Sequence, residues 1–200
     1  MDYGDATMMP RPFCFVLSTD AGVFDSHLVR SLSDLEGYFA DATAFRDLRE
    51  STNPVIYEVY EVRRPEVAGE LLHGLSVVHS GVVGNEYFMT KGHYHMVRDA
   101  AELYYCLAGH GMLLMENEEG EWAVEELLPG RVVYVTPSWA HRSVNISDQE
   151  DLVTFFVYPG HAGHDYGAIA QKGFRKRVLR RNHGPEIVDN EAWSEVCKSR

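Results

Sequence analysis

Short runs of hydrophobic residues, partly alternating with polar ones, dominate the chain between residues 54 and 159. The runs are rich in β-branched and aromatic residues, and Gly-, Pro-, Asn- and Asp-containing segments separate them, as is typical of strands joined by tight turns. The pattern predicts nine strands, at residues 54–62, 71–80, 85–90, 102–109, 111–117, 121–127, 131–136, 141–146 and 151–159. Many short strands at near-regular spacing favour a sandwich or a barrel.

Helical patterns flank this β region. Residues 31–50 have the pattern of a helix, with a capping box formed by Ser33 and Glu36. Gly37 weakens a single helix, and a break near Asp41 would give two short ones. A short helix is also expected at 165–173, ended by Gly173, and one or two helical turns at 189–198.

The fold expected is mainly all-β, a single barrel with short N- and C-terminal helices. The 200 residues suffice for one domain with a sizeable core. We expect this domain to span residues 1–200, with a core at about 54–160. An N-terminal extension of helix and strand, 13–53, and a C-terminal extension, 161–200, would complete it.

Composition and charge narrow the class of protein. The chain is 45% hydrophobic and 24% charged, which is ordinary for a globular protein. Its formal net charge is −12, without a basic stripe, so we expect neither nucleic acid nor an anionic membrane as a partner. No apolar run approaches the roughly 20 residues that span a bilayer, and the N-terminus does not resemble a secretory signal. Three distant cysteines also favour a reducing compartment, so cytoplasmic location is expected.

Candidate metal ligands cluster in the segment GHYHMVRDAAE. His93 and His95 are two residues apart, so on a strand they face the same side and can chelate one ion. Glu102 begins the next predicted strand, and His141 lies at the start of a later one. Three imidazoles and one carboxylate suit a divalent transition metal and leave coordination positions open. The competing interpretation is a surface histidine pair with an unrelated His141.

Several segments, taken in order, resemble one family. YFMTKGHYH, AELYYCLAGHG, PGRVVYVTPSWAHRSVN, YPGHAGHDYG and IAQKGF are similar to the cupin-type phosphoglucose isomerases of archaea and some bacteria, over residues 29 to 193. The resemblance implies a cupin β-barrel and an isomerase that interconverts glucose 6-phosphate and fructose 6-phosphate. It implies one divalent ion per subunit, with iron or manganese favoured over zinc, nickel or cobalt. It also implies four ligands, which are His93, His95, Glu102 and His141.

The same resemblance assigns substrate contacts. Phosphate-binding residues implied by it are Ser76, Thr90, Gly92 and Tyr158. His164 falls at a position that lines the sugar site, and Tyr104 faces the same side of its strand as Glu102. Lys91 is left open, because on a regular strand its side chain would point away from Thr90 and Gly92.

The chemistry implied is aldose–ketose isomerisation, which moves hydrogen between C1 and C2. Glu102 is the first candidate for the base of an enediolate route, with Tyr104 and His164 positioning the substrate or moving protons. A hydride shift, which needs no base, is the rival route. The alternative functions are another metal-dependent cupin, such as an isomerase of a different sugar, and a sugar-binding module. A homodimer is expected from the family and from exposed N-terminal strands.

The remaining histidines and a group of glutamates have no predicted role in the site. We expect the histidines to be surface or structural residues: His27, His73, His79, His110, His161 and His183. We expect the glutamates to form a solvated hairpin: Glu118, Glu119, Glu121, Glu125 and Glu126.

Overall fold

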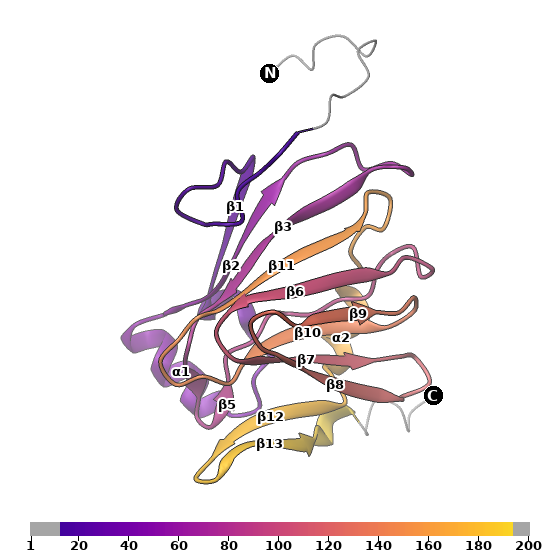
Figure 1. The fold of residues 1–200 in the computed structure, drawn as a ribbon. Coiled ribbons are helices and arrows are strands. Elements are labelled where there is room, and N and C mark those ends of the chain that lie inside the picture. Colours follow the sequence, from indigo (N-terminus) through magenta and orange to yellow (C-terminus); the bar gives the residue numbers. More distant parts are fainter. Residues whose placement is uncertain (1–12, 194–200) are drawn as a thin grey trace.

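The computed structural model describes residues 13–193, and antiparallel β-sheets dominate them (Figure 1). One sheet has the order β1-β2-β3-β11-β6-β9, the second β10-β7-β8, and the third β13-β12-β5-β4. The strands of the first sheet are β1 (Ser26–Ser31), β2 (Val55–Val62), β3 (Leu71–Val78), β11 (Leu152–Pro159), β6 (Glu102–Ala108) and β9 (Val132–Val135). Those of the second are β10 (Ala140–Asn145), β7 (Gly111–Glu116) and β8 (Trp122–Leu127). Those of the third are β13 (Gly184–Asp189), β12 (Lys176–Arg181), β5 (Glu86–Tyr87) and β4 (Val82–Val83).

Period-two alternation places one face of the central strands inside the barrel. On β11, every second residue from Leu152 to Tyr158 is buried, and on β6 the buried residues are Glu102, Tyr104 and Cys106. Leu113 of β7 joins the same core from the second sheet. The interior is therefore mostly apolar, and its buried polar side chains include Glu102 of β6, Thr154 of β11 and Ser76 of β3. The predicted all-β barrel is confirmed.

The predicted helix at 31–50 is two elements. A short 3₁₀ helix, η1 (Leu32–Leu35), precedes α1 (Ala42–Ser51). The break lies at Asp41, whose Oδ1 accepts hydrogen bonds from the backbone N–H groups of the next turn, at 3.1 and 2.9 Å. The predicted capping box was misplaced by two residues, because the backbone N–H of Ser31 donates to the Asp34 carboxylate at 2.9 Å.

Four of the described strands lie outside the predicted ones: β1, β4, β12 and β13. β1 is SHLVRS, and β12, KRVLRR, carries four cations, so neither alternates clearly between apolar and polar residues. β1 pairs with the predicted strand β2, and β12 pairs with β13 and, at Leu179, with β5. The β12–β13 hairpin lies at the foot of the view in Figure 1.

The helices near the C-terminus agree with the sequence. The helix α2 (Gly167–Lys172) ends at Gly173, whose φ of +67° lies in the left-handed region. Residues 191–193 are helical, and the remainder of the helix expected at 189–198 lies outside the described residues.

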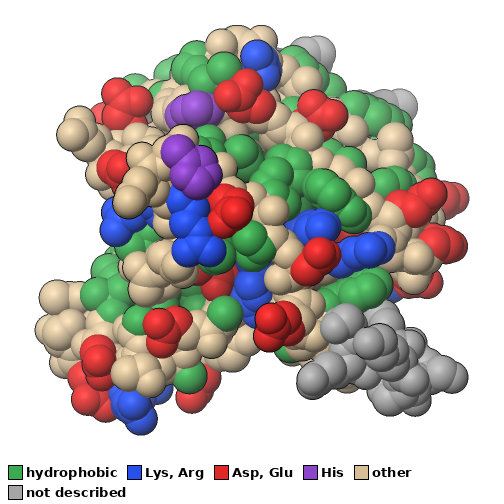
Figure 2. Space-filling model, turned by 90° about the horizontal axis from the view of Figure 1, so that it is seen from below, with side chains coloured by type: hydrophobic (Ala, Val, Ile, Leu, Met, Phe, Trp, Pro, Cys, Tyr) green, Lys and Arg blue, Asp and Glu red, His purple; other side chains and the backbone are tan. Residues whose placement is uncertain are grey.

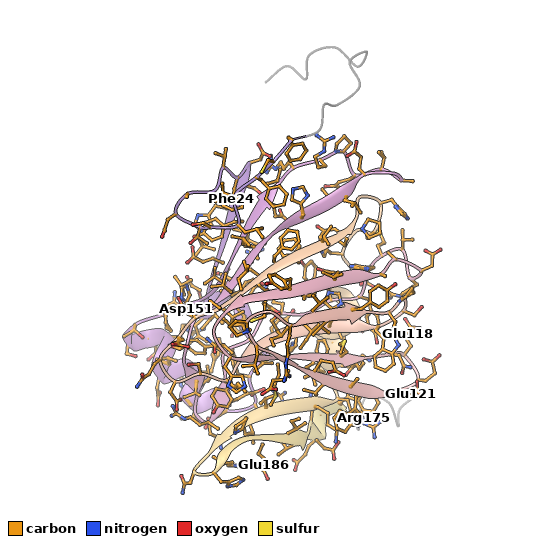
Figure 3. The ribbon with its side chains drawn as sticks, viewed as in Figure 1. Phe24, Glu118, Glu121, Asp151, Arg175 and Glu186 are labelled. Carbon is orange, nitrogen blue, oxygen red and sulfur yellow. The ribbon has the colours of Figure 1, made fainter. Side chains whose placement is uncertain are left out.

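Surface features agree with the charge pattern of the sequence. On the face shown in Figure 2, basic side chains are interspersed with acidic ones. Glu118 and Glu121 lie at the outer edge of the molecule, where β7 turns into β8 (Figure 3). Glu118, Glu119, Glu121 and Glu125 are exposed, and Glu126 is half-buried. Within residues 13–193, no helix is long and apolar enough to cross a membrane.

Candidate active site

Four side chains from three parts of the chain converge inside the barrel. His93, His95, Glu102 and His141 each present one ligand atom, and these atoms lie within 4.8 Å of one another. One carboxylate oxygen, Glu102 Oε2, lies 3.0 Å from His95 Nε2 and 2.9 Å from His141 Nε2. The pairing of His93 with His141 by an isolated antiparallel bridge brings β10 to the H-x-H segment. The structure therefore assembles the four residues that the sequence singled out.

The donor set fits a divalent transition metal ion. Nε2 of His93 and Nε2 of His141 are buried and make no hydrogen bond to any described residue, although the latter lies close to Glu102. Two buried imidazole nitrogens without partners are costly unless something else binds them. His95 Nδ1 lies 3.1 Å from the Ala100 carbonyl oxygen, and donation from Nδ1 would leave the Nε2 lone pair free for an ion. Three nitrogens and one carboxylate oxygen suit iron, manganese or zinc.

Burial and mutual charge perturb the pKa values of the cluster. Burial lowers the pKa of His93 well below its ordinary value, and the neighbouring His141 and His164 lower it further. Burial would raise the pKa of Glu102, but the charge of the nearby His141 and the hydrogen bond with His95 outweigh it and lower this pKa. Burial also opposes the charged form of His95, yet the hydrogen bond and charge of Glu102 prevail and raise its pKa. Without metal, the cluster therefore keeps an anionic glutamate beside a histidine that retains its proton more readily.

These shifts predict that metal loading releases a proton from His95. Because an ion binds only neutral imidazole, and the pKa of His95 is raised, the apparent metal affinity should fall as pH falls through this raised pKa. The expected slope is about tenfold per pH unit for one released proton. Calorimetry of metal binding in buffers with different ionisation enthalpies measures the proton release directly. Metal binding that releases no proton between pH 6 and 7 would contradict the prediction.

A cavity of about 100 Å³ opens onto the cluster. It is lined by the substrate-contact candidates together with three of the cluster residues: Ser76, Thr90, Gly92, Tyr104, Tyr158, His164, His93, Glu102 and His141. The fourth cluster residue, His95, does not line the cavity, and its Nε2 lies behind Glu102, 3.0 Å from Oε2. The structure thus brings every predicted site residue into one place.

Tyr104, on β6, and His164, in the loop before α2, both lie against the cluster. Burial raises the pKa of Tyr104 well above its ordinary value, and the charge of Glu102 and a hydrogen bond to it add to this effect. The His164 ring lies 4.4 Å from the His93 ring, and burial lowers the pKa of His164. The tyrosine therefore keeps its proton at neutral pH, and His164 favours its neutral form.

Two tyrosines of the cavity were missed by sequence reasoning. Tyr57 lies on β2 and Tyr166 follows the predicted His164 by two residues. The Tyr166 ring stacks on His164 at 5.9 Å. The two-residue spacing from His164 was a usable signal for Tyr166. Tyr57 carries no local signal, because its side of β2 becomes the cavity wall only after β2 pairs with β3.

A β-bulge shapes the segment that carries His93. Met89 pairs with Val144 and His93 with His141, so four steps along one strand oppose three along the other. Gly92 absorbs the extra residue with φ +72°. On a regular strand, side chains alternate between the two faces, and Lys91 would point away from Thr90 and Gly92. The bulge interrupts this alternation, and Lys91 lines the cavity.

An ion pair anchors the loop that carries His164 and Tyr166. Asp165, between them, accepts a hydrogen bond from Arg98 Nη2 at 2.7 Å. The backbone of Asp165 also pairs with that of Tyr94 in both directions, at 2.8 and 3.1 Å. Because neighbouring side chains of an extended segment alternate, this anchoring directs His164 and Tyr166 to the cavity side.

The other histidines lie outside this cavity. Two of them bind Glu58, His27 at 2.5 Å and His79 at 3.0 Å. His110 pairs with Glu126, and the His73 ring packs 4.5 Å from that of Phe15. His161 and His183 are exposed.

A cupin-type β-barrel whose interior can hold a metal ion is the class that this fold and site define. The sequence model of the glucose-6-phosphate isomerase (GPI) family matches residues 29–193. The glucose-6-phosphate isomerase of Pyrococcus furiosus is 44% identical over 190 residues, 94% of this chain and 100% of that protein. That of Sinorhizobium medicae is 44% identical over 163 residues, 80% of this chain and 76% of that protein. Among solved structures, an oxalate oxidase aligns with 52% of this chain and 49% of its own, at 9% identity and a TM-score of 0.41, too low to argue from.

The chain belongs to the glucose-6-phosphate isomerase family. The match confirms the family that the sequence motifs resembled.

Proposed function

We propose that this protein is a metal-dependent isomerase that interconverts glucose 6-phosphate and fructose 6-phosphate in the cytoplasm. One observation carries the proposal: a single cavity joins the three-histidine, one-glutamate cluster to a set of hydroxyl and amide donors. The family match supports the substrate class. A divalent ion, with iron or manganese favoured, would be held by His93, His95, Glu102 and His141. It would supply Lewis acidity to the two sugar oxygens that exchange roles in the reaction.

The phosphate end of the substrate would bind where Thr90 and Gly92 line the cavity. Thr90 Oγ1 accepts a hydrogen bond from the Ser143 N–H at 3.1 Å, so its own O–H remains able to donate to phosphate. Ser76 and Tyr158 add hydroxyl donors, and burial raises the pKa of Tyr158, which keeps it protonated. With a net charge of −12, the protein must attract a dianion through such local donors.

One short segment of the chain links the site for the phosphate end of the substrate to the site for its reacting end. Thr90 and Gly92 lie within three residues of His93, so two of the phosphate donors and one cluster residue share a segment of four residues. Hydrogen bonds to β10 fix this segment at both ends, from Thr90 N–H to the Ser143 carbonyl and from His93 N–H to the His141 carbonyl, at 2.9 and 3.2 Å. A six-carbon sugar phosphate is thereby oriented with its reacting end at Glu102.

Glu102 is the proposed base that moves the proton between C2 and C1. Its carboxylate is held ionised by His141 and His95, and the Tyr104 hydroxyl is its hydrogen-bonded neighbour. Tyr104 and His164 would exchange protons with the sugar oxygens as their charge changes. Incorporation of solvent isotope at C1 supports this proton-transfer route, whereas a hydride shift would leave C1 without solvent isotope.

The test of the function is a coupled assay of fructose 6-phosphate conversion to glucose 6-phosphate. Activity should disappear after chelation and return when a divalent ion is added back, while circular dichroism stays that of the folded barrel. Comparison of Fe²⁺, Mn²⁺, Zn²⁺, Ni²⁺ and Co²⁺ identifies the preferred ion. A folded, metal-loaded protein that leaves both sugar phosphates unchanged would overturn the proposal.

We also propose one domain over residues 1–200 and a homodimer in a reducing compartment. Edge strand β1 carries half-exposed Leu28 and Val29, which a second copy could cover. Cys14 and Cys106 are free thiols, as expected of a reducing compartment. Light scattering on a sizing column would show a mass twice that of the chain.

A further inference from the structure

Arg142 is a buried cation next to the cluster that has no part in the function described so far. It lies on β10 between His141 and Ser143, which line the cavity, so its side chain points to the opposite face. Arg142 is 3% exposed, and no carboxylate among residues 13–193 forms a direct ion pair with it, although the charges of Glu86 and Glu116 attract it from farther away. Because burial of a charge without a direct ion pair is costly, its close contacts must compensate for much of the lost hydration.

The contacts of Arg142 converge on the bulge at Gly92. Its Nη2 donates to the Lys91 carbonyl oxygen at 2.6 Å, and its guanidinium lies 4.3 Å from the centre of the Phe174 ring. A bulge interrupts the ladder of backbone hydrogen bonds and leaves the extra residue unpaired. The arginine side chain therefore supplies the donor that the ladder does not give to the Lys91 carbonyl.

The Lys91 carbonyl and the Gly92 N–H belong to the same peptide unit. The described chain has no cis peptide bond, so these two groups point in opposite directions. The carbonyl points to Arg142, away from the cavity, and the N–H accordingly points toward the cavity that Gly92 lines. No described residue accepts a hydrogen bond from this N–H.

We propose that Arg142 is a positioning residue that orients the Lys91–Gly92 peptide, so that its N–H donates to the phosphate of the substrate. This inference rests on the proposed function, because it requires phosphate at Gly92. A charge-assisted hydrogen bond to the carbonyl also polarises the peptide and makes its N–H a stronger donor. The positive charge of Arg142 thus acts on the anion through one peptide unit, without contact with substrate.

The experiment measures phosphate binding to the metal-loaded protein with Arg142→Met, which keeps an unbranched apolar stem but has neither charge nor donors. Calorimetry with inorganic phosphate should show about tenfold weaker binding, as expected for loss of an oriented charge-assisted contact. KM for fructose 6-phosphate should rise by a similar factor, while kcat changes less. The matched control is Arg177→Met, since Arg177 is also shielded from solvent but pairs with Glu86 at 2.8 Å and does not line the cavity. It should lower the melting temperature and leave phosphate binding unchanged.

The outcomes separate the inference from the function on which it rests. If the wild type neither isomerises fructose 6-phosphate nor binds phosphate, the proposed function fails. If the wild type does both, and folded Arg142→Met with full metal content binds phosphate as tightly, only the role of Arg142 is overturned. If Arg142→Met does not fold, Arg142→Lys decides, because an ammonium keeps the charge but lacks the planar fork. It should bind phosphate at least about threefold more weakly, and unchanged binding overturns the inference.

Discussion

The Glu102→Gln protein is expected to lose about 10²- to 10⁴-fold in kcat while it remains folded, the range associated with removal of a general base. Glutamine has nearly the same shape, and the side chain it replaces is almost fully buried, so packing is retained. What is lost is the charge that His95 and His141 face at 3.0 and 2.9 Å. Without that anion, metal affinity should fall as well, because one ligand becomes a weaker neutral donor.

Steady-state kinetics together with metal content by elemental analysis distinguish the two roles of Glu102. A variant that keeps its metal and loses kcat supports the base, and a variant that loses its metal supports the ligand. The matched control is Glu116→Gln, because Glu116 is equally buried but pairs with Lys172 at 2.7 Å and does not line the cavity. That control should lower stability and spare kcat. Wild-type kcat in Glu102→Gln would contradict the site assignment.

Gly92→Ala is expected to give the second largest loss, about 100-fold in kcat/KM, because a shift on the order of 1 Å in a site can cost that much. An alanine Cβ would meet Phe174 Cε2 at 2.5 Å and the His141 carbonyl oxygen at 2.9 Å. The residue must also hold φ +72°, which a side chain disfavours by roughly 1 kcal/mol or more. Relief of these contacts moves the peptide that donates to phosphate and the adjoining ligand His93.

Kinetics and thermal unfolding of Gly92→Ala should be compared with those of Gly69→Ala. Gly69 has φ +94° and open space around the added Cβ, so its substitution introduces the backbone strain without the collision. The control should lose about 1 kcal/mol of stability and keep wild-type kcat/KM. If Gly92→Ala behaves like this control, the bulge does not position the site.

Runs of β-branched and aromatic residues between turn signals were sufficient to predict the barrel strands but not the peripheral ones. The β11 segment, LVTFFVYP, is a run of β-branched and aromatic residues that predicts a strand, but nearly every position is apolar, so only the structure shows which face is buried. β12, KRVLRR, has the composition of a solvated segment and becomes a strand because β13 pairs with it along its whole length. Local propensity does not contain that pairing, which is a tertiary interaction.

By itself, the sequence determined the all-β class, the candidate ligand pair His93 and His95, and the family through its motifs. The tertiary structure decided how four ligand atoms meet within 4.8 Å, since His141 reaches the pair only through β10. It also decided the bulge at Gly92, which turned Lys91 toward the cavity and placed its carbonyl against Arg142. The physical reason is that the donor atom of a side chain is a property of one residue and can be read from the sequence. A bulge and the orientation of the Lys91–Gly92 peptide arise only when two strands, distant in sequence, pair in a fixed register.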